Sequence, residues 1–293
     1  MGGPGGRARR LAAAACVVGG LMVGTAGAQS GGDPNPGAMT LTTTMDASNA
    51  YLFRGIPQDD TGLILWPAAD LSVALRSGGG TLRSITVGVG TWNSLHTGVT
   101  GTDGPSGKLW YESDFSASAG LGFGGGVTLA AVYTAYTSPN GAFATVKELS
   151  MKVGAPLYGV SPYALVAFEL EGQADGGVVE GRYLEIGAAP SLTMAGAVVA
   201  FPVKLGLSLE GYYEGLEGDE QFGFFSVGGN ITVPLTSEQS RFGRWNAHGG
   251  ADFVRLGDSN ALRLGDNTKV IISAGIGLSY YCLLYTSPSP RDS

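Results

Sequence analysis

Short stretches in which apolar residues alternate with polar or small ones recur along most of this chain. Residues 203–210 (VKLGLSLE) and 270–280 (VIISAGIGLSY) show the pattern most clearly. Successive side chains of a β-strand point to opposite faces, so a period of two predicts strands with one apolar face. We expect twelve strands, at residues 39–54, 63–75, 82–92, 108–121, 126–136, 143–154, 162–171, 180–192, 201–213, 222–233, 244–255 and 269–280.

Both ends of the chain are predicted to lie outside this fold. Residues 1–28 contain Arg7, Arg9 and Arg10, an apolar run and the small residues Ala26-Gly27-Ala28, which is the pattern of a cleavable secretory signal. Residues 282–293 have a sequence that a sequencing-library transposon adapter encodes when it is read in frame, so we interpret them as non-native. The folded domain is then expected to span residues 29–281.

The apolar faces can meet lipid, or they can meet a second sheet. No run of 18 apolar residues follows the signal, and glycine, at 50 of 293 residues, disfavours helices. In an exported chain that lacks helices, we therefore predict an all-β fold, a transmembrane antiparallel β-barrel of about twelve strands in the bacterial outer membrane. A soluble exported β-sandwich is the alternative. Heat-modifiable mobility on a detergent gel would separate the two.

The connections between the predicted strands alternate in length. Residues 93–107, 172–179, 214–221 and 256–268 are long and polar, whereas 76–81, 122–125 and 155–161 are short. Outer-membrane barrels have short periplasmic turns and longer extracellular loops. The exceptions are the first connection, residues 55–62, and the connections at residues 193–200 and 235–243, which are intermediate.

Alternation also assigns each residue to the lipid face or to the lumen. Aromatic residues near strand ends are predicted to form interfacial girdles; they are Tyr51, Phe53, Trp66, Tyr133, Tyr213, Phe225 and Tyr280. Several lumen positions are glycine, which either widens a narrow pore or marks bends. The residues predicted to line the lumen are Arg54, Trp110, Glu112, Asp114, Glu148, Lys152, Glu169, Glu171, Glu185, Lys204, Glu210 and Asp252.

These lumen residues are more acidic than basic, and charged rings set the ion preference of a pore. The first functional hypothesis is therefore a passive channel for small polar or cationic solutes. The alternative is a non-transporting structural or adhesion barrel braced by salt bridges. The net charge of −7 argues against a nucleic-acid partner.

Few residues are available for catalysis or cofactor binding. The histidines are His96, in a predicted long loop, and His248, on a strand and facing the lumen. Neither lies in an acidic or cysteine cluster with metal-ligand spacing, and the glycine-rich residues 120–125 precede a strand rather than the helix that a dinucleotide would need. We expect no enzyme, no metal site and no cofactor.

Three segments resemble a known family. Residues 46–58 (DASNAYLFRGIPQ), 87–94 (VGVGTWNS) and 110–115 (WYESDF) are similar to the opening segments of the TorF-type porin family of proteobacteria. The resemblance covers the first third of the chain. It implies an outer-membrane barrel with a porin role and no catalytic residues. Arg54 lies in this motif, and Glu112 and Asp114 are its candidate partners.

Overall fold

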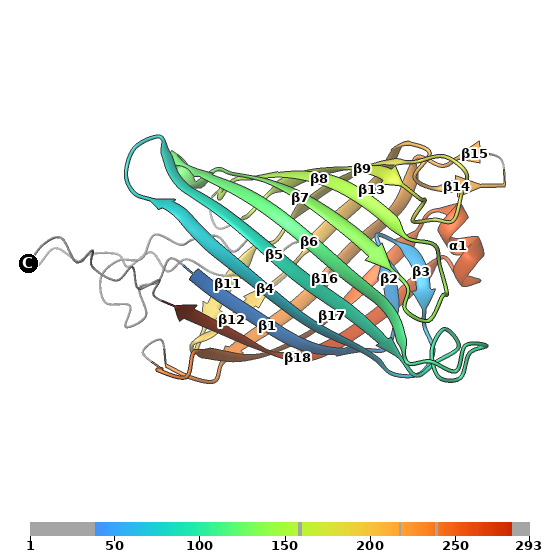
Figure 1. Ribbon diagram of the computed structural model, residues 1–293, viewed down its shortest axis with the longest axis horizontal. Helices are drawn as coiled ribbons and strands as arrows, with labels where there is room; N and C mark the ends of the chain where they lie inside the picture. The colour runs from blue at the N-terminus through green and yellow to red at the C-terminus, as the bar shows by residue number, and fades with distance from the viewer. Residues whose placement is uncertain (1–38, 158–159, 217, 238–239, 283–293) are drawn as a thin grey trace, which may run out of the picture.

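The computed structural model describes residues 39–157, 160–216, 218–237 and 240–282. The predicted signal peptide and all but the first residue of the predicted adapter segment lie outside these ranges. Figure 1 shows an elongated barrel of inclined strands, with β2, β3, β14, β15 and α1 gathered at one end. Within the described ranges, no helix is long and apolar enough to cross a membrane.

Fourteen strands form one antiparallel sheet, and twelve of them close into a barrel. Closure is complete because β1 pairs with both β4 and β18, while β17 pairs with both β16 and β18. The twelve barrel strands are β1 (Met39–Ser48), β4 (Ile64–Ser77), β5 (Leu82–His96), β6 (Trp110–Phe123), β7 (Thr128–Thr137), β8 (Val146–Gly154), β9 (Tyr163–Glu171), β10 (Arg182–Ala188), β13 (Val203–Glu210), β16 (Phe222–Pro234), β17 (Arg244–Leu256) and β18 (Thr268–Cys282).

The smaller elements connect these strands. The hairpin of β11 (Ser191–Met194) and β12 (Ala197–Ala200) extends the sheet by pairing with β16. The pairs β2 (Tyr51–Phe53) with β3 (Ile56–Asp59), and β14 (Glu214–Gly215) with β15 (Gly218–Asp219), form separate two-stranded sheets. A single 3-10 turn (Gly124–Gly126) and the helix α1 (Asp258–Leu264) lie in connections.

The prediction of a closed all-β barrel of twelve antiparallel strands is confirmed. The soluble sandwich is excluded because one closed sheet has no second sheet to pack against. Large apolar side chains are exposed on the outer wall, among them Val87, Val89, Phe115, Met151, Val153, Val227, Phe253, Ile272 and Ile276. A closed barrel with an apolar outer belt satisfies its backbone in lipid, so the protein is a transmembrane barrel of the outer-membrane type.

The first connection departs from the prediction. The strand predicted at residues 39–54 ends at Ser48, and the chain then forms the β2–β3 hairpin instead of continuing as a strand to residue 54. Ile56 of this hairpin packs in one buried cluster with residues of β9, β10, β16 and β17, while Tyr51 packs in another with residues of β4 and β6. Because these strands surround the barrel, the hairpin lies inside the lumen. We call residues 49–63 the lumen hairpin.

The aromatic residues in and around this hairpin are lumen residues. Tyr51 lies with its ring centroid 5.7 Å from that of Trp66, and Phe53 lies 5.2 Å from Tyr136. Tyr213 is buried in the cluster that contains Ile56. The assignment of Tyr51, Phe53, Trp66 and Tyr213 to interfacial girdles is therefore wrong; they fill the extracellular half of the barrel.

Candidate functional site

The lumen hairpin turns at Arg54 and Gly55, which both have positive φ, at 49° and 84°. Two consecutive residues with positive φ match the right-handed twist of a two-residue hairpin. Glycine adopts this conformation without strain, whereas arginine does so at a cost. A Cβ on Gly55 would also lie 2.9 Å from Phe224, so the turn packs directly against the opposite wall.

The Arg54 side chain is held on all sides. Its Nη1 and Nη2 atoms donate to Glu148 Oε2 and Oε1 at 2.5 and 2.7 Å, and Nη1 also donates to the Tyr212 hydroxyl at 2.8 Å. The guanidinium carbon lies 4.5 Å from the Tyr183 ring centroid. Burial alone would lower the pKa of Arg54, but Glu148 and its neighbours raise it well above its ordinary value. The predicted partners Glu112 and Asp114 are wrong, since the partner is Glu148.

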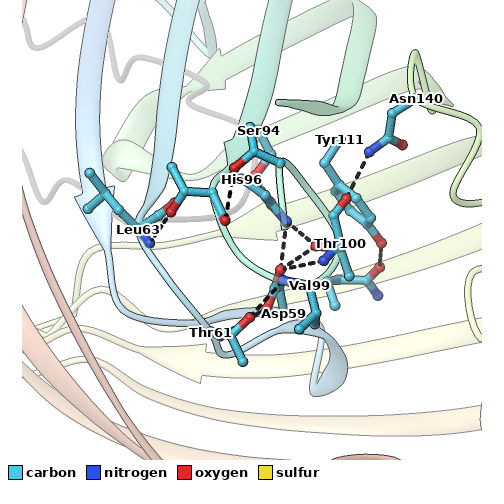
Figure 2. Close-up of polar contacts among 12 residues, drawn as sticks. Asp59, Thr61, Leu63, Ser94, His96, Val99, Thr100, Tyr111 and Asn140 are labelled. Atoms are coloured by element: carbon cyan, nitrogen blue, oxygen red, sulfur yellow. Dashed lines mark hydrogen bonds and ion pairs between the residues drawn. The ribbon is translucent and has the colours of Figure 1, made fainter. Parts of the chain in front are cut away.

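The other end of the hairpin is anchored at Asp59 (Figure 2). Asp59 Oδ1 accepts hydrogen bonds from the Thr61 amide at 2.9 Å and its hydroxyl at 2.7 Å, and Oδ2 accepts from the Thr100 hydroxyl. Burial raises the pKa of Asp59, but these hydrogen bonds outweigh burial and lower the pKa below its ordinary value. Asp59 therefore ties the hairpin to the loop that follows β5.

His96 completes this anchor at the end of β5. Its Nδ1 lies 2.6 Å from Thr100 Oγ1 and 3.4 Å from Asp59 Oδ2, while its Nε2 lies 2.6 Å from Ser94 Oγ. Its ring stacks on Tyr111 with centroids 4.2 Å apart. The prediction that His96 lies in a loop is wrong: it ends a strand and points into the lumen.

Ser94 contacts His96, and His96 contacts Asp59. This series of contacts resembles the nucleophile, base and acid of a catalytic triad. Ser94 and His96 are fully buried beneath the hairpin, and Trp66 Nε1 donates to Ser94 Oγ at 3.0 Å. A nucleophile needs a substrate within reach, and this arrangement places packed aromatic rings there instead. In the described conformation these contacts hold the hairpin. The period-two spacing Ser94-x-His96 is the sequence signal that could have placed both on one face.

Nine of the twelve predicted lumen residues lie on the lumen side. Glu169 accepts hydrogen bonds from the amides of Ala174 and Gly181, both at 2.6 Å. On the neighbouring strand β10, Glu185 accepts hydrogen bonds from the hydroxyls of Tyr163 at 2.6 Å and Tyr183 at 2.7 Å. The nine are Arg54, Glu112, Asp114, Glu148, Lys152, Glu169, Glu185, Lys204 and Asp252.

Trp110, Glu171 and Glu210 lie on the outer face, so their assignment to the lumen is wrong. Trp110 is 48% exposed and donates to Asn93 on the outer wall. Glu171 pairs with Lys147 at 2.5 Å, and Glu210 pairs with Arg182 at 2.7 Å, with all four side chains solvent-accessible.

One physical cause explains all three errors. Each residue lies just beyond an irregularity in the register, at which one strand carries an extra residue: Tyr111, Leu170 or Leu209. A β-bulge of this kind shifts the alternation by one, so the side chains on its far side point to the other face of the sheet.

Cysteine labelling checks these faces. In a Cys282→Ser background, we expect Glu210→Cys and Glu171→Cys to react with a charged, membrane-impermeant maleimide, because both side chains are exposed at the extracellular rim. Glu112→Cys is the matched control, and it is expected to stay unlabelled because Glu112 is buried in the lumen. Equal labelling at Glu210→Cys and Glu112→Cys would contradict the assignment.

The two halves of the lumen differ in exposure. In the extracellular half, Glu112, Glu148, Glu169 and His96 are buried around the hairpin. In the periplasmic half, the inward residues Thr42, Asp70, Ser116 and Ser118 remain partly exposed to solvent. Packed side chains therefore fill the extracellular half of the lumen, whereas the periplasmic half is partly accessible to solvent.

Glycines on the inner wall give room to neighbouring side chains. A Cβ on Gly187 would lie 2.5 Å from the Tyr163 ring, and one on Gly88 would lie 2.9 Å from Ser118 Oγ. These glycines accommodate the packed lumen residues and do not by themselves open a pore.

No protein-family model matches this chain, and no curated protein is similar to it in sequence. Its fold is similar to that of outer membrane phospholipase A from Escherichia coli, with 8% identity over 82% of this chain and 92% of that chain, and a TM-score of 0.43. The translocator domain of the autotransporter NalP from Neisseria meningitidis shows 14% identity over 85% and 90%, with a TM-score of 0.40. The NanC porin shows 9% identity over 81% and 98%, with a TM-score of 0.41. These similarities concern the barrel architecture alone.

Proposed function

We propose that this barrel is an outer-membrane channel for small polar or cationic solutes, closed on its extracellular side by the lumen hairpin. The hairpin carries the proposal, because it spans the lumen between opposite walls while the periplasmic half stays partly exposed. The resemblance to TorF-type porins adds support, and its first segment, residues 46–58, includes the turn of the hairpin. Membership in that family is part of the proposal.

The charges on the inner wall favour cations. Arg54 is engaged by Glu148, and Lys152 lies over the Tyr163 ring with its Nζ 4.0 Å from the centroid. Glu112, Asp114 and Asp252 add further carboxylates on the inner wall. An excess of carboxylates along a narrow path raises the local concentration of cations and repels anions.

Removal of the hairpin tests the proposal. Residues 50–61 are replaced by a short Gly-Ser linker, and the refolded protein is studied in planar bilayers. We expect wild-type protein to give small or rare single-channel steps, and the deletion to raise the step size about 5-fold or more with preference for K⁺ over Cl⁻, since the wide part of a twelve-stranded lumen becomes continuous. Heat-modifiable mobility establishes that each variant is folded.

A matched control replaces residues 192–199, the hairpin at the opposite end of the barrel, with the same linker. Its step size should stay near that of the wild type. A folded hairpin deletion without conductance would overturn the channel and leave the non-transporting structural or adhesion barrel. Preference for Cl⁻ would overturn the proposed cation preference alone.

A further inference from the structure

Two carboxylates lie side by side behind the lumen hairpin. Glu112 and Asp114 occupy successive inward positions on β6; Glu112 is buried, and Asp114 is half-buried with its Oδ1 atom fully covered. The Glu112 carboxyl group lies within reach of the Tyr51 hydroxyl and of the Asp114 carboxyl group. Two neighbouring carboxylates in a buried site cannot both be ionised without a proton or a cation between them.

The nearby basic group does not neutralise this pair. Arg54 directs both guanidinium nitrogens to Glu148 in a bidentate ion pair. Within the described part of the chain, no salt bridge joins a lysine or arginine to Glu112 or Asp114. Two carboxylates therefore share the site without a protein cation.

Asp114 supplies the observation that points to a ligand. Among the described residues, its Oδ1 is one of three buried side-chain atoms without a hydrogen-bond partner. A buried carboxylate oxygen that lacks a partner is costly unless something else binds it. The Oδ1 atom, the Glu112 carboxylate and the Tyr51 hydroxyl offer only oxygen ligands, which hard cations prefer.

Oxygen-bearing side chains continue from the pair toward the partly exposed half of the lumen. Ser116 follows Asp114 on the inner face of β6 and is partly exposed. Opposite it, Gly90 has no side chain, and a Cβ there would lie 2.9 Å from Ser116 Oγ and would also meet the Asp70 carboxylate.

We infer that Glu112 and Asp114, with the Tyr51 hydroxyl, form a binding site for one hard divalent cation, Mg²⁺ or Ca²⁺, at the base of the lumen hairpin. Two carboxylates match a divalent charge, and water completes the coordination shell, as it commonly does around Mg²⁺. Binding does not require that the barrel conduct. The ion joins β6 to Tyr51 and so secures the hairpin.

The test uses terbium as a luminescent hard-cation probe on the refolded, EDTA-treated full chain in detergent micelles. Trp92 pairs with Asp114 across β5 and β6, so excitation of tryptophan should sensitise bound Tb³⁺. We expect saturable luminescence that Ca²⁺ or Mg²⁺ displaces with a Kd of about 0.1–1 mM, in the range of weak protein sites. Asp114→Asn and Glu112→Gln should each weaken Tb³⁺ binding about 10-fold or more.

Glu210→Gln is the matched control, because this carboxylate lies on the outer face, and it should bind Tb³⁺ as the wild type does. A second readout is the urea midpoint, which Ca²⁺ or Mg²⁺ should raise in the wild type and leave unchanged in Asp114→Asn. The inference is overturned if Asp114→Asn and Glu112→Gln retain wild-type Tb³⁺ binding, if K⁺ displaces the probe as well as Ca²⁺ does, or if no saturable signal appears. In the last case the pair shares a proton only.

Discussion

Replacing Glu148 by alanine is expected to lower the free energy of unfolding by about 3–5 kcal/mol, the usual cost of removing one partner from a buried ion pair. Glu148 is 2% exposed, and its carboxylate holds both Nη atoms of Arg54. Without Glu148, the Arg54 guanidinium stays buried among aromatic rings with only the Tyr212 hydroxyl as a polar partner on that side. The measurement is a urea titration of protein refolded into phospholipid vesicles.

The double variant separates the ion pair from the loss of packing. Arg54→Ala with Glu148→Ala leaves no unpaired charge, so its cost should fall below the sum of the two single variants by about 2 kcal/mol or more. Lys147→Ala is the control on the same strand, since its exposed pair with Glu171 should contribute no more than about 1 kcal/mol. Additive costs for Arg54 and Glu148 would contradict this account.

The single variant Glu148→Ala also shows whether the hairpin can leave the lumen while the barrel stays closed. Trypsin cleaves after arginine, and Arg54 lies at the turn of the hairpin. We expect wild-type protein to resist cleavage at Arg54 and Glu148→Ala to be cut there. Resistance of both proteins would show that the remaining contacts, including Tyr213 OH to the Arg54 carbonyl at 2.8 Å, suffice to hold the turn.

The barrel could be predicted because its cause is local. A strand that separates lipid from a polar lumen must alternate along its length, so Val227 with Gly228 or Phe115 with Ser116 reveals the strand and its faces without knowledge of the partner. Loop length then alternates because one end of each hairpin faces the periplasm. Neither inference needs a contact between residues far apart in sequence.

The prediction errors arise where contacts between residues far apart in the sequence determine the direction of a side chain or the path of the chain. The extra residues Tyr111, Leu170 and Leu209 look like ordinary strand residues, and only the pairing of neighbouring strands shows that each forms a bulge. The lumen hairpin also alternates, so Tyr51 and Phe53 read as a continuation of the first strand. The pair Arg54-Gly55 was the available signal, because a residue before glycine between two apolar stretches favours a two-residue turn.

The partner of Arg54 shows the same limit. Glu148 lies 94 residues away in the sequence. Alternation predicted that it faces the lumen but not where it lies along the barrel axis. Glu112 and Asp114 were equally plausible partners of Arg54, because alternation predicted that they also face the lumen. The fold of the hairpin back into the lumen brings Arg54 to Glu148 and leaves the β6 carboxylates together.

Replacing Val227 by arginine is expected to destabilise the barrel by about 2–4 kcal/mol in phospholipid vesicles. Val227 is exposed on the outer wall in the middle of β16, where its neighbours in register are Val203 and Phe253. An arginine at this depth must carry its charge into the hydrocarbon or bend toward the interface, and both are unfavourable. Urea titration in vesicles measures the loss.

The matched control lies on the same strand and the same face. Val233 is also exposed on the outer wall but lies one residue from the end of β16, so Val233→Arg places its charge near the interface, where the cost falls to about 0–1 kcal/mol. The difference between the two variants depends on the bilayer, because both side chains are solvent-accessible in its absence. In detergent micelles, which adapt to the protein, the difference should shrink. Equal costs at Val227 and Val233 in vesicles would mean that the middle of the outer wall does not face hydrocarbon, and the membrane orientation derived from the apolar belt would then be wrong.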